Sequence, residues 1–370
     1  MDTNAMDRNA MDRDVMDTDK EGKRWRNLLG MASRPKAVVA ATPCDVVHHE
    51  NKWRLLRYRS GNVRFATPLL LVPSLINRHY VLDLQPGKSF VEYLVARGHD
   101  VWCIDWGTPQ AEDRFVTLND VADVWLGRAM RLCAQSSVRK QAHVLGYCMG
   151  GTLAAMHAAV HPNYVASLTL LAAPVRFGDA GSLAAMTRNS AFDIEVLTRA
   201  VGLVPARLLQ ASFQLLRPTL GLAKAVNLVD RAWNDRYLDG YFAMETWAND
   251  NVALPGAFYR TWIEEVYRRN GLWQGNLTLG AQLVDLQKIS CPLLAVVFSQ
   301  DAIAPAADCA AVLERIGSAD KQLLDVAGSH VGGVTSRDAS KTLWPALSAW
   351  WQARDGVRAK PQMNEGATDA

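Results

Sequence analysis

The most reactive pattern in this sequence is centred on a cysteine. Cys148 stands in Gly146-Tyr-Cys-Met-Gly-Gly151, directly after the apolar run His143–Tyr147 and directly before the helix-like run Thr152–Val160. This order of strand, G-x-C-x-G turn and helix is that of a nucleophile elbow with cysteine in place of serine. A helix N-terminus also favours the thiolate form of a cysteine placed there. The pattern predicts a nucleophile; the alternative is an inert cysteine beside a glycine-rich turn.

A cysteine nucleophile needs a base and a group that orients the base. In chains with this elbow the order is nucleophile, acid, histidine. Asp301 follows the apolar run Leu293–Ser299, and His330 follows the run Gln322–Val326. Both residues would lie on loops at the carboxyl ends of strands, where open α/β sheets bind their ligands. We therefore predict a catalytic triad of Cys148, Asp301 and His330.

An acyl transfer through this triad also needs an oxyanion hole, in which two donors face the developing negative charge. The backbone amide of Met149, directly after the nucleophile, is the first predicted donor. The second normally comes from the loop after the first core strand, which is here Pro73–Arg78. We assign it to Ile76, with Leu75 as the alternative.

The elements that must position these residues are visible as short apolar runs separated by helix-like segments. Six runs have strand length: Arg64–Pro73, Val101–Asp105, His143–Tyr147, Ser167–Ala172, Leu293–Ser299 and Gln322–Val326. Their apolar character is continuous rather than alternating, which indicates strands buried on both faces. Strands separated by helices indicate parallel crossover units. The sequence predicts an α/β fold with a mostly parallel, doubly wound sheet.

One long segment interrupts this alternation. Between Pro174 and Ser290 no run resembles a strand, and Val196–Val229 is apolar at helical spacing. We expect a helical cap over the sheet. Its tryptophans suit either core filling or the lining of a tunnel or docking surface; they are Trp233, Trp247, Trp262 and Trp273.

These boundaries divide the chain into five parts. We expect an unstructured repeat tail over 1–24, the first part of the core over 25–173 and the helical cap over 174–290. The second part of the core would cover 291–355, and a further unstructured tail 356–370. The first tail repeats MDTNA-like pentads that are too polar and too short to bury a face.

Composition excludes several classes of function. Forty Lys and Arg against 37 Asp and Glu give a net charge of +3 in 370 residues, so no nucleic-acid partner is expected. The six cysteines show no CxxC pair or regular spacing, which favours reduced thiols in an intracellular protein. No HxH, HExxH or Cys/His cluster appears, so no metal site is predicted. The chain shows neither a secretory signal nor a membrane-spanning run, and we expect a cytoplasmic protein.

At these motifs the chain resembles the polyhydroxyalkanoate synthases, which belong to the α/β-hydrolase superfamily. Besides the elbow and the loops of Asp301 and His330, three stretches carry the resemblance: Pro73-Ser-Leu-Ile-Asn-Arg78, Tyr80-Val-Leu-Asp-Leu-Gln-Pro86 and Gly98-His-Asp-Val-Trp-Cys-Ile-Asp-Trp-Gly107. Together they span most of the sheet region. The cap matches more loosely, through Trp233, Trp247 and Trp262.

The resemblance implies an acyltransferase that polymerises (R)-3-hydroxyacyl-CoA into polyhydroxyalkanoate, with release of CoA through a Cys148 thioester. Acyl-CoA would be a substrate, and no cofactor is expected. The resemblance implies that Asp301 chiefly helps to activate the attacking 3-hydroxyl, alone or through His330. Because only about 60 residues precede the first core strand, the chain is similar to the short catalytic subunit that works with an accessory subunit. A homodimer and association with polyester granules are further expectations.

Two other functions fit the same residues. A cysteine hydrolase or thioesterase of this fold would keep the triad and admit water. A noncatalytic granule-binding protein would use the apolar cap as its interface.

Overall fold

The computed structural model describes residues 19–178, 182–189, 191–216 and 220–355. The expected tail at 356–370 and residues 1–18 of the expected first tail lie outside this range. Within it, no helix combines the length and the apolar character that a membrane crossing requires.

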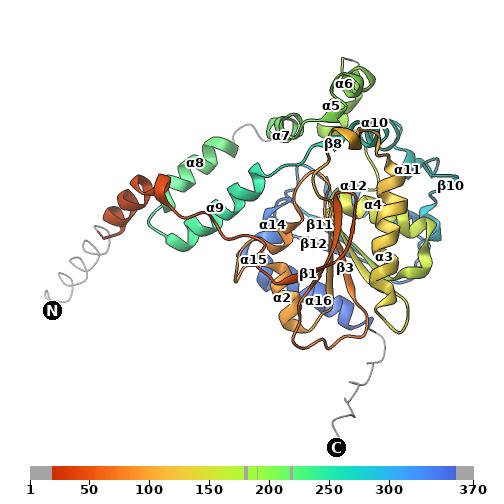
Figure 1. The fold of residues 1–370 in the computed structure, drawn as a ribbon, viewed down its shortest axis with the longest axis horizontal. Coiled ribbons are helices and arrows are strands. Elements are labelled where there is room, and N and C mark those ends of the chain that lie inside the picture. Colours follow the sequence, from red (N-terminus) through yellow and green to blue (C-terminus); the bar gives the residue numbers. More distant parts are fainter. Residues whose placement is uncertain (1–18, 179–181, 190, 217–219, 356–370) are drawn as a thin grey trace, which may run out of the picture.

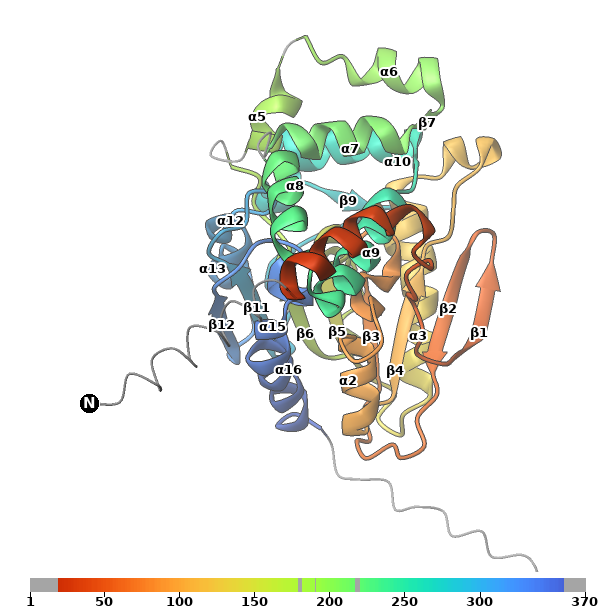
Figure 2. The same cartoon turned by 90° about the vertical axis from the view of Figure 1, so that its left-hand side faces the viewer.

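The core is an eight-stranded sheet in the order β1-β2-β4-β3-β5-β6-β11-β12 (Figures 1 and 2). Its strands are β1 Cys44–Glu50, β2 Trp53–Tyr58, β3 Leu69–Val72, β4 Val101–Asp105, β5 Ala142–Tyr147, β6 Val165–Leu171, β11 Leu293–Phe298 and β12 Lys321–Val326. β1 pairs antiparallel with β2, and β2 pairs antiparallel with β4. Every other pairing in this sheet is parallel. The predicted fold class, a mostly parallel α/β-hydrolase sheet, is confirmed.

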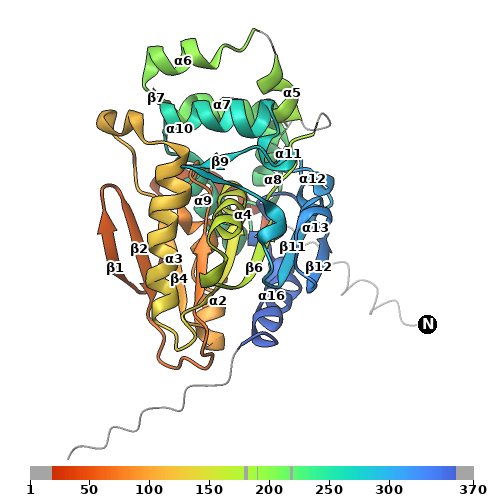
Figure 3. The ribbon, with the colours of Figure 1, turned by 90° about the vertical axis from the view of Figure 1, so that its right-hand side faces the viewer.

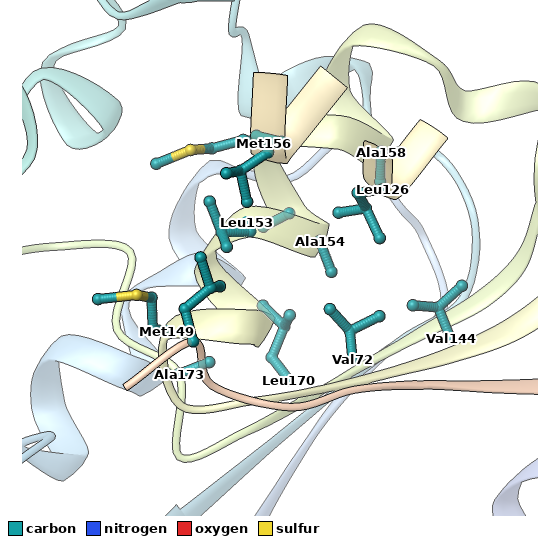
Figure 4. Packing of buried hydrophobic residues seen from close by; sticks show 14 of the residues in the cluster. Val72, Leu126, Val144, Met149, Leu153, Ala154, Met156, Ala158, Leu170 and Ala173 are labelled. Atoms are coloured by element: carbon teal, nitrogen blue, oxygen red, sulfur yellow. The ribbon is translucent and has the colours of Figure 1, made fainter. Parts of the chain in front are cut away.

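The central strands are buried on both faces, as their continuous apolar character predicted. Along β3, Leu70 and Val72 belong to one core cluster, whereas Leu69 and Leu71 belong to the other. Four helices cover the two faces: α3 Leu126–Gln135 and α4 Met149–Val160 on one, α2 Phe90–Arg97 and α16 Leu343–Gln352 on the other (Figure 3). Figure 4 shows Leu153 and Ala154 of α4 packed above Val72 and Leu170. α4 is therefore held firmly against the sheet.

All six predicted strands are present within a few residues of their expected bounds, but the hairpin of β1 and β2 was not predicted. In β1 only Cys44, His48 and Glu50 are partly covered, and no residue is buried. In β2, Arg54 and Arg57 interrupt the apolar residues and are exposed. Continuous apolar runs mark the six predicted strands, and this edge hairpin has none.

The segment between β6 and β11 is mostly helical and extends over the carboxyl end of the sheet (Figure 2). Its helices are α5 Ser182–Arg188, α6 Ile194–Val201, α7 Ala206–Leu215, α8 Leu220–Arg231, α9 Asp235–Asn249, α10 Gly256–Thr261, the π-helical η6 Trp262–Arg268, α11 Gly271–Gln274 and η7 Leu286–Lys288. It also holds two small strand pairs, which were not expected: β7 Leu203–Val204 with β8 Leu254–Pro255, and β9 Thr278–Leu279 with β10 Gln282–Leu283.

The remaining elements are short. They are η1 Met31–Ser33, η2 His79–Asp83, η3 Ala111–Phe115, the π-helical η4 Asp120–Trp125, η5 Pro162–Tyr164, α12 Ala306–Ala310, α13 Val312–Arg315, α14 Gly332–Thr335 and α15 Arg337–Lys341.

The expected unstructured tail over 1–24 is wrong at its end, because a helix covers residues 19–29. This helix lies beside α8 and α9 (Figures 1 and 2). Lys23 Nζ pairs with Asp235 Oδ2 at 2.9 Å, and Asn27 Nδ2 donates to the backbone oxygen of Ala232 at 2.7 Å. These contacts come from residues more than 200 positions away, so the local polar composition did not reveal them.

Candidate active site

Cys148 occupies a sharp turn between β5 and α4. Its backbone has φ 56° and ψ −132°, a conformation that costs a non-glycine residue free energy. Its amide donates to the backbone oxygen of Leu171 on the neighbouring strand β6, at 3.0 Å. The turn directs the half-buried Cys148 into a cavity above the sheet. Strain held in place by packed neighbours is typical of a nucleophile elbow.

The glycines around Cys148 are required because backbone approaches backbone here. A Cβ atom on Gly146 would lie 2.2 Å from Cα of Gly151, and a Cβ on Gly150 would lie 2.1 Å from the carbonyl oxygen of Val72. No side chain fits at such distances. The glycines thus allow α4 to begin directly against β3 and β5.

The structure brings Asp301 and His330 together beside Cys148. Asp301 follows β11 and His330 follows β12, two adjacent parallel strands. Nδ1 of His330 lies 2.6 Å from Oδ2 of Asp301. The other carboxylate oxygen of Asp301 accepts from the amides of Ile303 at 2.8 Å and Ala304 at 2.9 Å. The Asp301 side chain is completely buried, so both of its oxygens are committed to protein donors.

His330 also hydrogen-bonds Cys148. Burial alone would lower the pKa of His330, but the negative charge of a Cys148 thiolate and the hydrogen bonds of Asp301 and Cys148 outweigh it and raise the pKa to about 10. A protonated His330 beside the sulfur is the state that this balance favours. Tyr147, the residue before the nucleophile, stacks on the imidazole with ring centroids 5.3 Å apart.

The two candidate residues for the second oxyanion donor line different pockets. Ile76 lines the same cavity as Cys148, whereas Leu75 lines a separate small pocket beside Trp106. The amide of Ile76 donates to Oγ of Ser74 at 3.3 Å, a long hydrogen bond. Met149 begins α4 directly after the nucleophile. The pair of Met149 and Ile76 stays a prediction, and this placement favours Ile76 over Leu75.

The cavity above Cys148 has a volume of about 320 Å³. The loop after β3 and the loops after β11 and β12 form its floor, and α7, α8 and α9 form its roof. Its apolar lining residues include Ile76, Val81, Phe213, Leu216, Trp247, Ala248, Ala302, Ile303 and Val331. Lys224 of α8 also lines it, and its Nζ pairs with Oε1 of Glu245 at 2.5 Å. The cavity thus gives Cys148 mostly apolar surroundings.

The roof is joined to the floor by contacts that sequence analysis missed. Nε of Arg78 lies 3.0 Å from Oδ1 of Asp250, and the hydroxyl of Tyr80 donates to Oδ2 of the same carboxylate at 2.8 Å. The side chains of Asn77 and Asn251 are hydrogen-bonded to each other. These partners are separated by about 170 residues. No sequence pattern indicates that these residues are partners.

The four cap tryptophans have different environments. Trp247 lines the cavity, and its Nε1 donates to the backbone oxygen of Arg78 at 3.0 Å. Trp262 is buried and stacks on Phe258, as core filling predicts. Trp273 is partly buried and faces two guanidinium groups, and Trp233 lies beneath Lys20. Trp262 therefore fits the interpretation of core filling, and Trp247 fits that of cavity lining.

Two family models match this chain. The model described as "alpha/beta hydrolase fold" matches residues 67–332. The model described as "Poly-beta-hydroxybutyrate polymerase (PhaC) N-terminus" matches residues 36–94. Their matched ranges run from the segment before β1 to α14, so they include the loops that carry Cys148, Asp301 and His330.

Several curated relatives are similar over most of the chain, and each is named "Poly(3-hydroxyalkanoate) polymerase subunit PhaC". The one from Haloferax mediterranei is 33% identical over 91% of this chain and 71% of its own length. The one from Allochromatium vinosum is 32% identical over 90% of this chain and 94% of its own length. The one from Synechocystis is 31% identical over 91% of each chain.

Solved structures share the fold at low sequence identity. A putative non-heme bromoperoxidase from Mycobacterium tuberculosis matches with a TM-score of 0.53 and 16% identity, covering 84% of this chain and all of its own. A thermophilic esterase from Thermogutta terrifontis matches with a TM-score of 0.51 and 17% identity, covering 87% of this chain and 99% of its own. These likenesses support the fold alone.

Proposed function

The chain belongs to the poly(3-hydroxyalkanoate) polymerase family within the α/β-hydrolase fold, and from this premise we propose that it makes polyester by passing acyl groups through a thioester on Cys148. It is an acyltransferase that polymerises hydroxyacyl units into polyhydroxyalkanoate. The observation that carries the proposed route is the hydrogen-bonded series of Cys148, His330 and Asp301 at the floor of an apolar cavity.

In the first step, His330 holds the proton of Cys148, and the sulfur attacks the thioester carbonyl of a (R)-3-hydroxyacyl-CoA. The amides of Met149 and Ile76 would stabilise the resulting oxyanion. The bond from the carbonyl carbon to the CoA sulfur then breaks, and the CoA thiolate takes the proton from His330. The products are free CoA and an acyl group on Cys148. Because a thioester replaces a thioester, this exchange is nearly neutral in free energy.

In the second step, a 3-hydroxyl group attacks the acyl carbonyl on Cys148. His330 takes the hydroxyl proton and returns it to the departing sulfur of Cys148. An oxoester replaces a thioester here, and the greater stability of the ester drives the polymerisation forward. Neither step needs a redox or metal group, so acyl-CoA enters as substrate and no cofactor takes part.

Asp301 is a positioning residue in this route rather than a direct base for the hydroxyl. Its carboxylate is buried, and both oxygens already accept hydrogen bonds from His330 Nδ1 and from two backbone amides. The neighbouring Ala302 and Ile303 line the cavity, but Asp301 is not among its lining residues. This geometry supports action through His330, because Asp301 fixes the tautomer that leaves Nε2 free to accept a proton.

The cap supports transfer to an alcohol over transfer to water. Phe213, Leu216 and Trp247 cover the nucleophile with apolar surface, and this excludes water from the acyl-enzyme. A polyester segment is itself apolar along most of its length and suits such walls. The cap therefore favours polymerisation over hydrolysis at Cys148.

Incubation of the purified chain with 3-hydroxybutyryl-CoA tests the function. Release of CoA together with insoluble polyester supports the polymerase. Release of CoA with free 3-hydroxybutyrate supports a thioesterase of the same fold. Absence of CoA release, in the presence of any accessory subunit, supports a noncatalytic granule protein.

An accessory subunit and the granule surface are the partners that best fit the outer face of the cap. Exposed apolar side chains lie on α6, α7 and α8, where Val196, Leu215, Leu222 and Val226 are each more than 60% exposed. A monomer in water usually covers such residues.

Co-expression with the accessory subunit should raise CoA release per Cys148, and substitution of Leu222 and Val226 by Gln should remove that increase. Equal turnover and no co-purification would show a self-sufficient subunit, as a monomer or a homodimer.

A further inference from the structure

A second cluster of potential ligand atoms lies at the other end of α4 from Cys148. His157 and His161 are one helical turn apart, and Asp123 of η4 lies beside them. One nitrogen of each histidine and one carboxylate oxygen of Asp123 lie within 4.8 Å of one another. We propose that these three side chains bind a divalent transition-metal ion of the zinc type, at a site separate from the polymerase chemistry.

The strongest evidence is the state of His157. Its side chain is buried, with 1% of the residue exposed, and Nδ1 lies 2.9 Å from the carbonyl oxygen of Ala122. A carbonyl can only accept, so Nδ1 carries the hydrogen and Nε2 carries a lone pair. That Nε2 is enclosed and has no hydrogen-bond partner among the described residues. Metal-binding histidines usually donate their other ring N–H to a carbonyl or carboxylate, and His157 is held in this way.

The other two ligands are close enough to complete the site. Nε2 of His161 lies 2.7 Å from Oδ1 of Asp123, and the imidazoles of His157 and His161 have centroids 4.8 Å apart. Zinc bonds of about 2.0–2.1 Å place neighbouring tetrahedral ligands about 3.3 Å apart. The most distant pair of ligand atoms, which lie up to 4.8 Å apart, must therefore approach by about 1.5 Å. The ion replaces the proton that His161 and Asp123 now share.

Partial exposure makes this adjustment feasible. The side chains of Asp123 and His161 are 27% and 30% exposed, so both can move without disturbing the core. The same exposure gives the ion a route from solvent and leaves room for water as a fourth ligand. Gly127 leaves space beside the buried ring, because a Cβ there would lie 2.8 Å from Cε1 of His157.

One neighbouring charge opposes a cation. Nη1 of Arg131 lies 3.3 Å from the position of that same Gly127 Cβ, and its charge acts on His157. Asp123 supplies the opposite charge. This opposition provides a test, because removal of Arg131 should strengthen metal binding without changing a ligand.

The bound ion would join α4 to η4 through His157 and His161, which are 9 and 13 residues from Cys148. Its role would be structural, since a helix places these two ligands about 14 and 20 Å from Cys148. An ion that binds the folded state alone raises the midpoint of thermal unfolding, and the rise grows with the logarithm of the ratio of free ion concentration to Kd.

Zinc titration of the full, chelator-treated chain tests the site by calorimetry and thermal unfolding. We expect Asp123→Asn and His161→Gln each to weaken Zn²⁺ binding by at least about tenfold and to reduce the Zn²⁺-dependent rise in the unfolding midpoint. His49→Gln, which changes an exposed histidine, is the matched control and should bind as the wild type does. Arg131→Gln should bind more tightly. Circular dichroism verifies that each variant is folded.

Cysteine thiolates are the main competing ligands for zinc, so the experiment is repeated in Cys148→Ala and with Co²⁺. A nitrogen and oxygen site gives no intense near-ultraviolet sulfur-to-cobalt band, and its binding persists in Cys148→Ala. Equal Zn²⁺ affinity in the wild type, Asp123→Asn and His161→Gln would overturn the proposal, as would binding that disappears in Cys148→Ala. Neither readout uses polymer formation, so the result is independent of the proposed function.

Discussion

The hydroxyl of Tyr147 donates to the backbone oxygen of His330 at 3.0 Å. The residue before the proposed nucleophile therefore holds the loop that carries the proposed base, and the imidazole of His330 stacks on the same tyrosine. Burial raises the pKa of Tyr147 well above its ordinary value, so its hydroxyl stays a donor. The contacts of Tyr147 thus hold His330 at its distance from Cys148, while Asp301 fixes the orientation of the imidazole.

Cys148→Ala should abolish acylation and leave the fold intact. Alanine fits the elbow and removes only the sulfur. Incubation with radiolabelled hydroxyacyl-CoA should leave no covalent adduct, and an adduct of wild-type intensity would contradict the assignment. Cys148→Ser should lose most activity rather than become a serine enzyme, because an alcohol is a much weaker acid than the thiol for which His330 is placed.

Asp301→Asn and His330→Gln should fail at different steps. A thiol needs little help to lose its proton, so Asp301→Asn should still acylate Cys148. Activation of an alcohol depends more strongly on the oriented base, and elongation should fall by about 10²–10⁴-fold. His330→Gln should fail already at acylation. Single-turnover labelling followed by product sizing separates the two steps, and equal loss of acylation in both variants would argue against this division.

Removal of the thiol should lower the pKa of His330. In the wild type the imidazolium persists above pH 6.5, the ordinary midpoint of histidine, up to about pH 10, because the charge of Cys148 and two hydrogen bonds outweigh burial. In Cys148→Ala, burial and Asp301 remain, and the midpoint should fall by about 1–3 pH units. Nitrogen-15 spectra of the imidazole across a pH titration measure this directly. An unchanged midpoint would show that the cysteine does not control His330.

Phe213→Gln should shift the products from polyester toward free hydroxy acid. Phe213 lies in the roof over Cys148, and a polar side chain there admits water to the acyl-enzyme. The measurement is the ratio of free acid to polymer at equal CoA release. Phe115→Gln is the control, since Phe115 is 70% exposed and outside the cavity lining. If both variants give the wild-type ratio, the roof at Phe213 does not exclude water.

Gly150→Ala should destabilise the fold and prevent acylation. The added methyl group would lie 2.1 Å from the carbonyl oxygen of Val72, and the overlap should cost about 1–3 kcal/mol or more. Gly221→Ala is the matched change in α8, where nothing lies within 4 Å of the new Cβ, and it should be neutral or stabilise by up to about 1 kcal/mol. Chemical denaturation compares them. Equal stability of the two variants would show that α4 can move away from β3.

The positions of the proposed triad could be predicted from the sequence. His330 follows β12, an edge strand without a buried residue, but Cys148 and Asp301 follow β5 and β11, in which every residue is buried. Such strands have an unbroken apolar signal, and the order of the loops after them is fixed by the fold. The hairpin of β1 and β2 lies at the sheet edge, where exposed polar residues interrupt that signal. The hairpin forms by pairing with β4, and no local sequence pattern predicts that pairing.

Contacts between distant segments were likewise beyond prediction. The spacing of His157 and His161 was visible, but Asp123 lies 34 residues before His157 and approaches it only because η4 packs against α4. The interaction of Arg78 with Asp250 depends on where the cap folds back over the sheet. Charge and composition show that such residues are polar, but they do not identify the partners.

The same stretch of chain that closes the roof also supports the proposed oxyanion donor. Immediately after α9, the amide of Val252 donates to the backbone oxygen of Ile76 at 3.0 Å, and Asp250 holds Arg78 and Tyr80. A displacement of α9 that widened the entrance would therefore pull on the loop of Ile76 at the same time. With Ile76 as the proposed donor, substrate entry and readiness for chemistry would be mechanically opposed, and an acyl-CoA admitted by an open cap would meet an incomplete catalytic site until the cap returned.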